Sequence, residues 1–264
     1  MRSDQFDVFR TTFEGLEQGL RVKHIATFAL ETCDADALSQ GGLSEPRLAG
    51  FDYVPITSGG RIQAVVNRKP PEPEEMTLHD GLLVSSEMPL LSFLPLMGTE
   101  PHFRLVLDGA VIGGIVTRTD LLKLPVRVLA FGLITHLEMV MAEAIQQHFG
   151  RDSMAWMPRL KLEDDKEADL HDRIERARKQ NLDLSPLGET DFGHKAKIIK
   201  SIHGLGKDFK SELHLLKELR NDLAHAKDYA ATQAKLTRFL ELLGRAQHWI
   251  ERVPTLASQC GQAK

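Results

Sequence analysis

The 264-residue chain has little of what marks secreted, metal-binding or membrane proteins. Its two cysteines, Cys33 and Cys260, are too far apart for a metal-ligand or redox motif, which favours a reduced cytoplasmic compartment. The first ten residues lack the apolar core of a signal peptide. The most apolar stretch, residues 124–145, includes Arg127, and no run of roughly 18 uncharged apolar residues is present. We therefore expect a soluble cytoplasmic protein that does not bind membranes.

A large excess of one charge is also absent, since 33 Lys and Arg oppose 37 Asp and Glu, a net charge of −4. Residues 125–264 hold 22 basic against 20 acidic side chains, whereas residues 1–124 hold 11 against 17. The C-terminal half is therefore the better candidate for binding a polyanion. No metal-ligand cluster, Gly-x-Ser-x-Gly nucleophile motif or complete phosphate-binding loop occurs, so we expect no metal and no required cofactor.

The pattern of predicted elements changes near residue 124. Strand–turn–strand patterns at 51–68 and 102–122, about 50 residues apart, indicate an internal duplication. Beyond them strand patterns stop, and helices are predicted at about 126–148, 161–180, 194–226 with a break at 203–206, and 230–252, before a frayed tail. We expect the α+β class, with one domain at residues 1–124 and an all-α domain at residues 125–264.

The second repeat ends in GGIVTRTDLL, in which Gly114 precedes two apolar residues, Thr117, two further residues and Asp120. This segment resembles the signature of a CBS domain (named for cystathionine β-synthase), and the resemblance to a tandem CBS pair covers residues 20–124. It implies β-α-β-β-α repeats and a regulatory adenine nucleotide (AMP, ADP or ATP) bound at Gly114, Thr117 and Asp120. A carboxylate at a strand-to-helix junction can accept hydrogen bonds from ribose hydroxyls, but it can equally well cap its own helix.

The first repeat departs from that signature. Ala64, Asn67 and Pro70 stand where the glycine, threonine and aspartate belong. We therefore expect at most one nucleotide site per chain, and a pair of repeats that only mediates dimerisation is the alternative.

The stretch LLKELRNDLAHA, residues 215–226, contains Arg220, Asn221 and His225. An Arg-x-x-x-x-His spacing is expected roughly once by chance in a chain of this composition, so the context has to carry the argument. An apolar stripe is expected to leave Arg220 and His225 on its flanks; its members are Leu213, Leu216, Leu219, Leu223 and Ala226. This arrangement resembles the HEPN family (higher eukaryote and prokaryote nucleotide-binding) over residues 127–252, with Glu138 as the acidic residue of the first helix.

The HEPN resemblance implies a dimeric endoribonuclease that needs no metal. His225 would act as general base or acid as the ribose 2′-OH attacks the adjacent phosphate, and Arg220 would stabilise the developing charge. Asn221 would orient His225 or bind the phosphate, and the products would end in 2′,3′-cyclic phosphate. The implied partners are RNA, a second copy of the chain and an antitoxin or other protein; a toxin or anti-phage role follows from the resemblance alone. The alternative is a non-catalytic nucleotide-sensing regulator whose helical domain dimerises or binds a partner.

Overall fold

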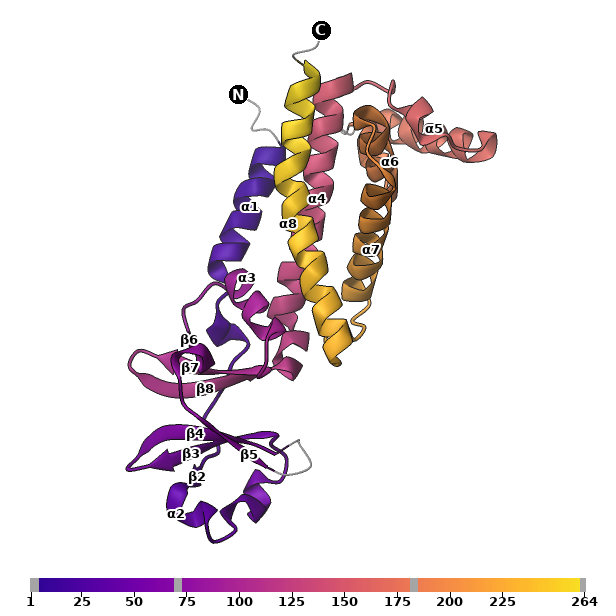
Figure 1. The fold of residues 1–264 in the computed structure, drawn as a ribbon. Helices are drawn as coiled ribbons and strands as arrows, with labels where there is room; N and C mark the ends of the chain where they lie inside the picture. Colours follow the sequence, from indigo (N-terminus) through magenta and orange to yellow (C-terminus); the bar gives the residue numbers. More distant parts are fainter. Residues whose placement is uncertain (1–4, 69–72, 181–184, 262–264) are drawn as a thin grey trace. The chain divides into compact units, whose positions relative to one another are not determined.

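The computed structural model describes residues 5–68, 73–180 and 185–261 (Figure 1). The chain forms two compact units: a helical unit that combines Met1–Glu17 with Arg127–Lys264, and a β unit, Gln18–Val126. The protein is thus a mixed α and β protein with a helical C-terminal part, in line with the predicted α+β class. The predicted boundary after residue 124 lies two positions before the boundary between the units.

The larger difference from the predicted domains is helix α1 (Gln5–Gly19), most of which belongs to the helical unit. Phe13 is buried, and both Phe13 and Leu16 pack closely on Gly132 of α4 (Leu124–Phe149). A Cβ atom added to Gly132 would lie 3.2 Å from the Leu16 side chain and 3.4 Å from the Phe13 ring. Phe9 and Phe13 also contact the His136 ring, with centroid distances of 6.0 and 4.9 Å. The i, i+4, i+7 spacing of Phe9, Phe13 and Leu16 is the sequence signal of this helix.

The β unit contains two four-stranded sheets. The first has the strand order β2 (Cys33–Asp34), β3 (Tyr53–Ser58), β4 (Arg61–Asn67), β5 (Glu74–Thr77). The second has the order β1 (Thr27–Phe28), β8 (Val111–Thr117), β7 (Phe103–Asp108), β6 (Leu83–Ser85). Short helices precede the hairpins, namely α2 (Ala35–Leu38) and α3 (Leu90–Phe93). Both sheets thus contain a parallel β-α-β pair followed by an antiparallel hairpin.

The two hairpins confirm the predicted duplication, because β7–β8 repeats β3–β4 at an offset of fifty residues. Tyr53 pairs with Asn67 in one hairpin, and Phe103 pairs with Thr117 in the other. Each ladder also shifts register between the fourth and fifth residues of its first strand. Asn67 therefore occupies the position in the first repeat that Thr117 occupies in the second.

The expectation of a helix closing each repeat is wrong for the first repeat, where strand β5 follows β4. Prolines at 70, 71 and 73 explain this, since proline has no amide hydrogen to donate within a helix; Pro70 itself lies outside the described residues. After β8 the chain forms the 3₁₀ helix η6 (Arg118–Leu122) and then α4. The other 3₁₀ helices are η1 (Val22–His24), η2 (Gly42–Ser44), η3 (Pro46–Leu48), η4 (Asp80–Leu82), η5 (Leu94–Gly98), η7 (Met157–Leu160) and η8 (Pro186–Glu189).

The helical unit confirms the predicted succession of helices. These are α4 (Leu124–Phe149), α5 (Asp164–Lys179), α6 (Phe192–His203), α7 (Lys207–Ala224) and α8 (Gln233–Gly261). Helix α7 packs against α8, where the Phe209 and Trp249 rings meet edge to face at 4.6 Å. Helix α5 projects sideways from the other helices (Figure 1), and its buried residues are Leu170 and Ile174.

Helix α4 is long and apolar enough, by length and composition, to cross a membrane. More than half of its most apolar segment is buried inside the protein, including Leu133, Leu137 and Met141. Packing in the core of the helical unit therefore explains its composition.

Helix α8 extends further than predicted, and the expected frayed tail is wrong as far as Gly261. Pro254 lies inside the helix and gives up one backbone hydrogen bond. The adjacent Val253 is completely buried, so the helix still packs on the core where it reaches the proline.

Candidate functional site

The residues Arg220, Asn221 and His225 lie at the C-terminal end of α7. Asn221 belongs to its last turn, Arg220 directly precedes that turn, and His225 is the C-cap, whose amide donates a hydrogen bond to the Asn221 carbonyl at 3.0 Å. The leucines of the predicted apolar stripe are buried, namely Leu213, Leu216, Leu219 and Leu223. Ala226, predicted as part of this stripe, is instead exposed, because the helix ends at Ala224 and residue 226 has a left-handed φ of 54°.

Arg220 reaches α4, where its side chain pairs with Glu138. The Arg220 Nη1 and Glu138 Oε2 atoms are 3.5 Å apart, and the side chains are 31% and 13% exposed. The guanidinium carbon also lies 5.6 Å from the centre of the Phe131 ring, which is cation–π distance. The structure thus brings together two of the four residues predicted as catalytic, although they are 82 positions apart in the chain.

Lys195 completes this cluster, although it was not among the predicted site residues. Its Nζ donates hydrogen bonds to Glu138 Oε1 at 3.0 Å and to the Thr190 carbonyl at 2.6 Å. The lysine side chain is 7% exposed, so it is not part of a solvated basic face. Its sequence signal is its position on α6, where it stands at i+3 from Phe192 and i−3 from Ile198, both of which are buried.

Asn221 and His225 are exposed, one turn apart. Neither side chain has a hydrogen bond or ion pair with any described residue. The imidazole and the amide are therefore accessible to a ligand, but no described side chain fixes the orientation of the ring.

A hollow of about 130 Å³ lies between this end of α7 and α8. Its lining residues are Leu219, Asp222, Asp228, Tyr229, Lys235, Arg238, Phe239 and Leu242. Burial raises the pKa of Tyr229 to about 12, although Arg127 opposes the increase. Its phenol is thus a hydrogen-bond donor at neutral pH and not a general base.

The three residues predicted to bind a nucleotide have distinct structural environments. Asp120 Oδ2 accepts hydrogen bonds from the Thr117 amide at 2.7 Å and from the Thr117 hydroxyl at 2.9 Å, and Asp120 Oδ1 lies 2.7 Å from Lys123 Nζ. The carboxylate thus caps η6, which was the alternative considered for it. Gly114 faces β1, where an added Cβ would lie 3.1 Å from the Thr27 carbonyl oxygen and from the Phe28 ring.

A cleft of about 280 Å³ lies within the β unit and includes equivalent positions of both repeats. It is lined by Asp52, Tyr53, Asn67, Glu100, His102, Thr117, Arg118 and Thr119. Thr117 is the one member of the predicted nucleotide set that lines it. The His102 Nε2 atom lies 2.7 Å from a Glu100 carboxylate oxygen, and Arg118 adds a cation to the same cleft.

Within the described ranges, no group of three or more His, Cys, Asp or Glu side chains could hold a metal ion. No family model matches the chain, and comparisons with curated proteins and with solved structures find no match. The geometry of the two units is therefore the basis of the functional argument.

Proposed function

We propose that the protein is a metal-independent endoribonuclease of the HEPN kind that acts as a homodimer. The observation that carries the proposal is the Arg220–Glu138 ion pair, which holds a cation directly before Asn221 in the chain and five residues before His225, both of which are exposed. These side chains are the ones that RNA cleavage by an internal hydroxyl requires: an imidazole that can transfer a proton and a fixed donor of several N–H bonds.

In the proposed reaction, the His225 imidazole removes the proton from a ribose 2′-OH as its oxygen attacks the adjacent phosphorus. Arg220 donates hydrogen bonds to the phosphorane oxygens, because its guanidinium has five N–H groups and Glu138 occupies only one side of it. The P–O5′ bond breaks, the 5′ oxygen takes a proton, and a 2′,3′-cyclic phosphate remains. A second copy of the chain would bring a second His225 and so supply both the base and the acid.

Regulation by an adenine nucleotide at the β unit is the second part of the proposal. The cleft that contains Thr117 supports it, since about 280 Å³ approaches the lower end of small-molecule sites. A bound phosphate would compete with Asp120 for the Thr117 hydroxyl, which now donates to that carboxylate.

A non-catalytic regulator is the second candidate, and the observation that supports it is that no described side chain orients the His225 ring. The guanidinium is already paired with Glu138 and stacked on Phe131, which is also what a purely structural arginine at a helix–helix contact does. In that case, the same end of α7 would bind a partner protein such as an antitoxin or a second copy of the chain.

The test is RNA cleavage in EDTA by the wild-type protein, by His225→Ala and by the matched control His214→Ala. His214 lies on the same helix and is 70% exposed, so its loss should not change cleavage. The proposal expects 2′,3′-cyclic phosphate ends from the wild type and the control, and none from His225→Ala. The regulator would be favoured if all three proteins cleaved RNA equally. It would also be favoured if none of them cleaved RNA, whether or not AMP or ATP was present.

A further inference from the structure

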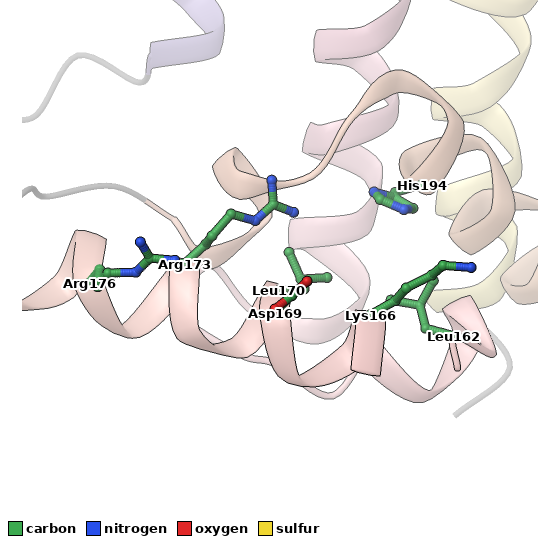
Figure 2. Close-up of a pocket in the computed structure, with 7 residues that line it drawn as sticks. All are labelled: Leu162, Lys166, Asp169, Leu170, Arg173, Arg176 and His194. Carbon is green, nitrogen blue, oxygen red and sulfur yellow. The ribbon is translucent and has the colours of Figure 1, made fainter. Parts of the chain in front are cut away.

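An open groove of about 460 Å³ lies along α5, opposite the start of α6 (Figure 2). We call it the α5 groove; it is lined by Leu162, Lys166, Asp169, Leu170, Arg173, Arg176 and His194. None of these residues belongs to the Arg220–Glu138–Lys195 cluster, so the groove is a separate feature of the helical unit.

One face of α5 supplies most of the lining. Lys166, Leu170, Arg173 and Arg176 stand at i, i+4, i+7 and i+10, which places them along the same side of the helix. Leu170 is buried, and it anchors the helix while the cations lie beside it. The cations extend over ~15 Å of helix, a length that exceeds a single phosphate group.

The cations of the groove are only partly neutralised. Lys166 pairs with the exposed Glu163 at 2.5 Å, and Arg176 Nε donates to the Asp172 carbonyl of its own helix. Arg173 has no hydrogen bond or ion pair with any described residue. Asp169 is the one carboxylate among the lining residues, so three cations face one anion.

His194 adds a neutral hydrogen-bond donor from α6. The Asp191 amide donates to its Nδ1 at 3.4 Å, which leaves the proton of the neutral ring on Nε2. Burial lowers the pKa of His194; Asp191 opposes this, and the nearby cations Lys197, Lys217 and Arg173 lower it further. The ring is therefore neutral at pH 7 and can donate from Nε2.

We propose that the α5 groove binds the phosphate backbone of single-stranded RNA. Arginine forks and an imidazole N–H match phosphate oxygens, and the row of cations suits a chain of phosphates better than a single enclosed ligand. The partly exposed Leu162 provides apolar surface for ribose and base edges. This inference rests on the proposed function, for which the groove supplies substrate binding away from the Arg220 and His225 end of α7.

The test measures the binding of a fluorescent 2′-O-methyl RNA dodecamer to the full-length protein at several salt concentrations. This RNA lacks the attacking hydroxyl, so binding is separated from cleavage. The groove variant is Arg173→Ala with Arg176→Ala. The matched control is Arg178→Ala with Lys179→Ala, which removes the same charge from the same helix outside the groove.

We expect the groove variant to bind RNA about tenfold more weakly or worse, and the control to bind within about twofold of wild type. Each phosphate contact to a single strand adds about 0.7 to the slope of log affinity against log salt, so the groove variant should lose about 1.4. The proposal would be overturned if the groove variant bound RNA as tightly as wild type, or if the control lost as much affinity as the groove variant. It would also be overturned if the wild type bound no RNA, or if poly-glutamate competed as well as unlabelled RNA.

The outcomes separate this inference from the ribonuclease proposal. If the groove variant loses RNA binding while no protein cleaves RNA, the groove stands and the ribonuclease falls. If His225→Ala abolishes cleavage while the groove variant binds RNA like wild type, the ribonuclease stands and the groove falls.

Discussion

Lys195 Nζ lies 3.0 Å from Glu138 Oε1, and the pair lies in the interior of the helical unit with side chains 7% and 13% exposed. The other oxygen of the same carboxylate faces Arg220. Glu138 is thus held between a buried lysine and a half-buried arginine, so the position of Arg220 depends on a residue that is distant from it in the chain.

Replacing Lys195 with Met should destabilise the protein by about 3 kcal/mol, because Glu138 would remain buried without its closest partner. Urea unfolding would measure the loss. Lys197→Ala, on the exposed side of the same helix, should cost no more than about 0.5 kcal/mol. A Lys195→Met protein as stable as this control would show that the pair contributes nothing.

Gly114→Ala should cost about 1–3 kcal/mol, because the new Cβ would lie 3.1 Å from the Thr27 carbonyl oxygen, which β1 cannot easily move away. Thermal unfolding would detect it. Gly113→Ala is the control on the same strand, since its Cβ would have no contact closer than 3.8 Å. Equal unfolding temperatures for the two variants would contradict the close approach of β1 to β8.

Asp120→Ala should lower stability by about 1–2 kcal/mol in the absence of any nucleotide, because the Thr117 amide loses its acceptor. Asp120→Asn should cost less, since the amide oxygen can still accept that bond. Denaturant unfolding with the exposed Thr119→Ala as control would measure both. If Asp120→Ala were as stable as wild type, the carboxylate would be there for a ligand and not for the cap.

The protein should lose stability as the pH falls below about 6.5, and His136 should account for part of the loss. Burial lowers the pKa of His136, Arg10 lowers it further, and Glu14 opposes both. The unfolded chain therefore takes up a proton near pH 6.5, whereas the folded protein takes it up only at lower pH. The contribution of the neutral His136 ring to the free energy of unfolding is thus complete above pH 6.5 and is lost as the pH falls below it.

His136→Leu should make the dependence of stability on pH flatter between pH 7.5 and 5.5. The difference in slope should stay below about 1.4 kcal/mol per pH unit, because one imidazole binds at most one proton more in the unfolded chain than in the folded protein. Unfolding free energies at both pH values would measure it. Parallel curves for the variant and the wild type would mean that His136 contributes nothing.

The duplication and the order of the C-terminal helices could be predicted because they depend on local signals. Gly59 and Gly109 have positive φ in the two hairpin turns, a conformation that glycine adopts without strain. The leucines of α7 repeat at helical spacing, and the 203–206 break contains Gly204 with a left-handed φ of 62°. Helix α1 was missed because its apolar spacing covers only about two turns, and its place in the helical unit depends on packing against the distant Gly132.

The sequence by itself determined which residues form each hairpin and helix, since backbone preference and apolar periodicity act over a few neighbouring residues. Only the tertiary structure decided which distant side chains meet. Lys195 could be read as one of several solvated lysines, and it became a buried partner of Glu138 because α6 turns that face toward α4. The sequence allowed Asp120 to be a ligand-binding carboxylate. In the structure its two oxygens are instead paired with Thr117 and Lys123, because the course of the turn brings those two side chains to it.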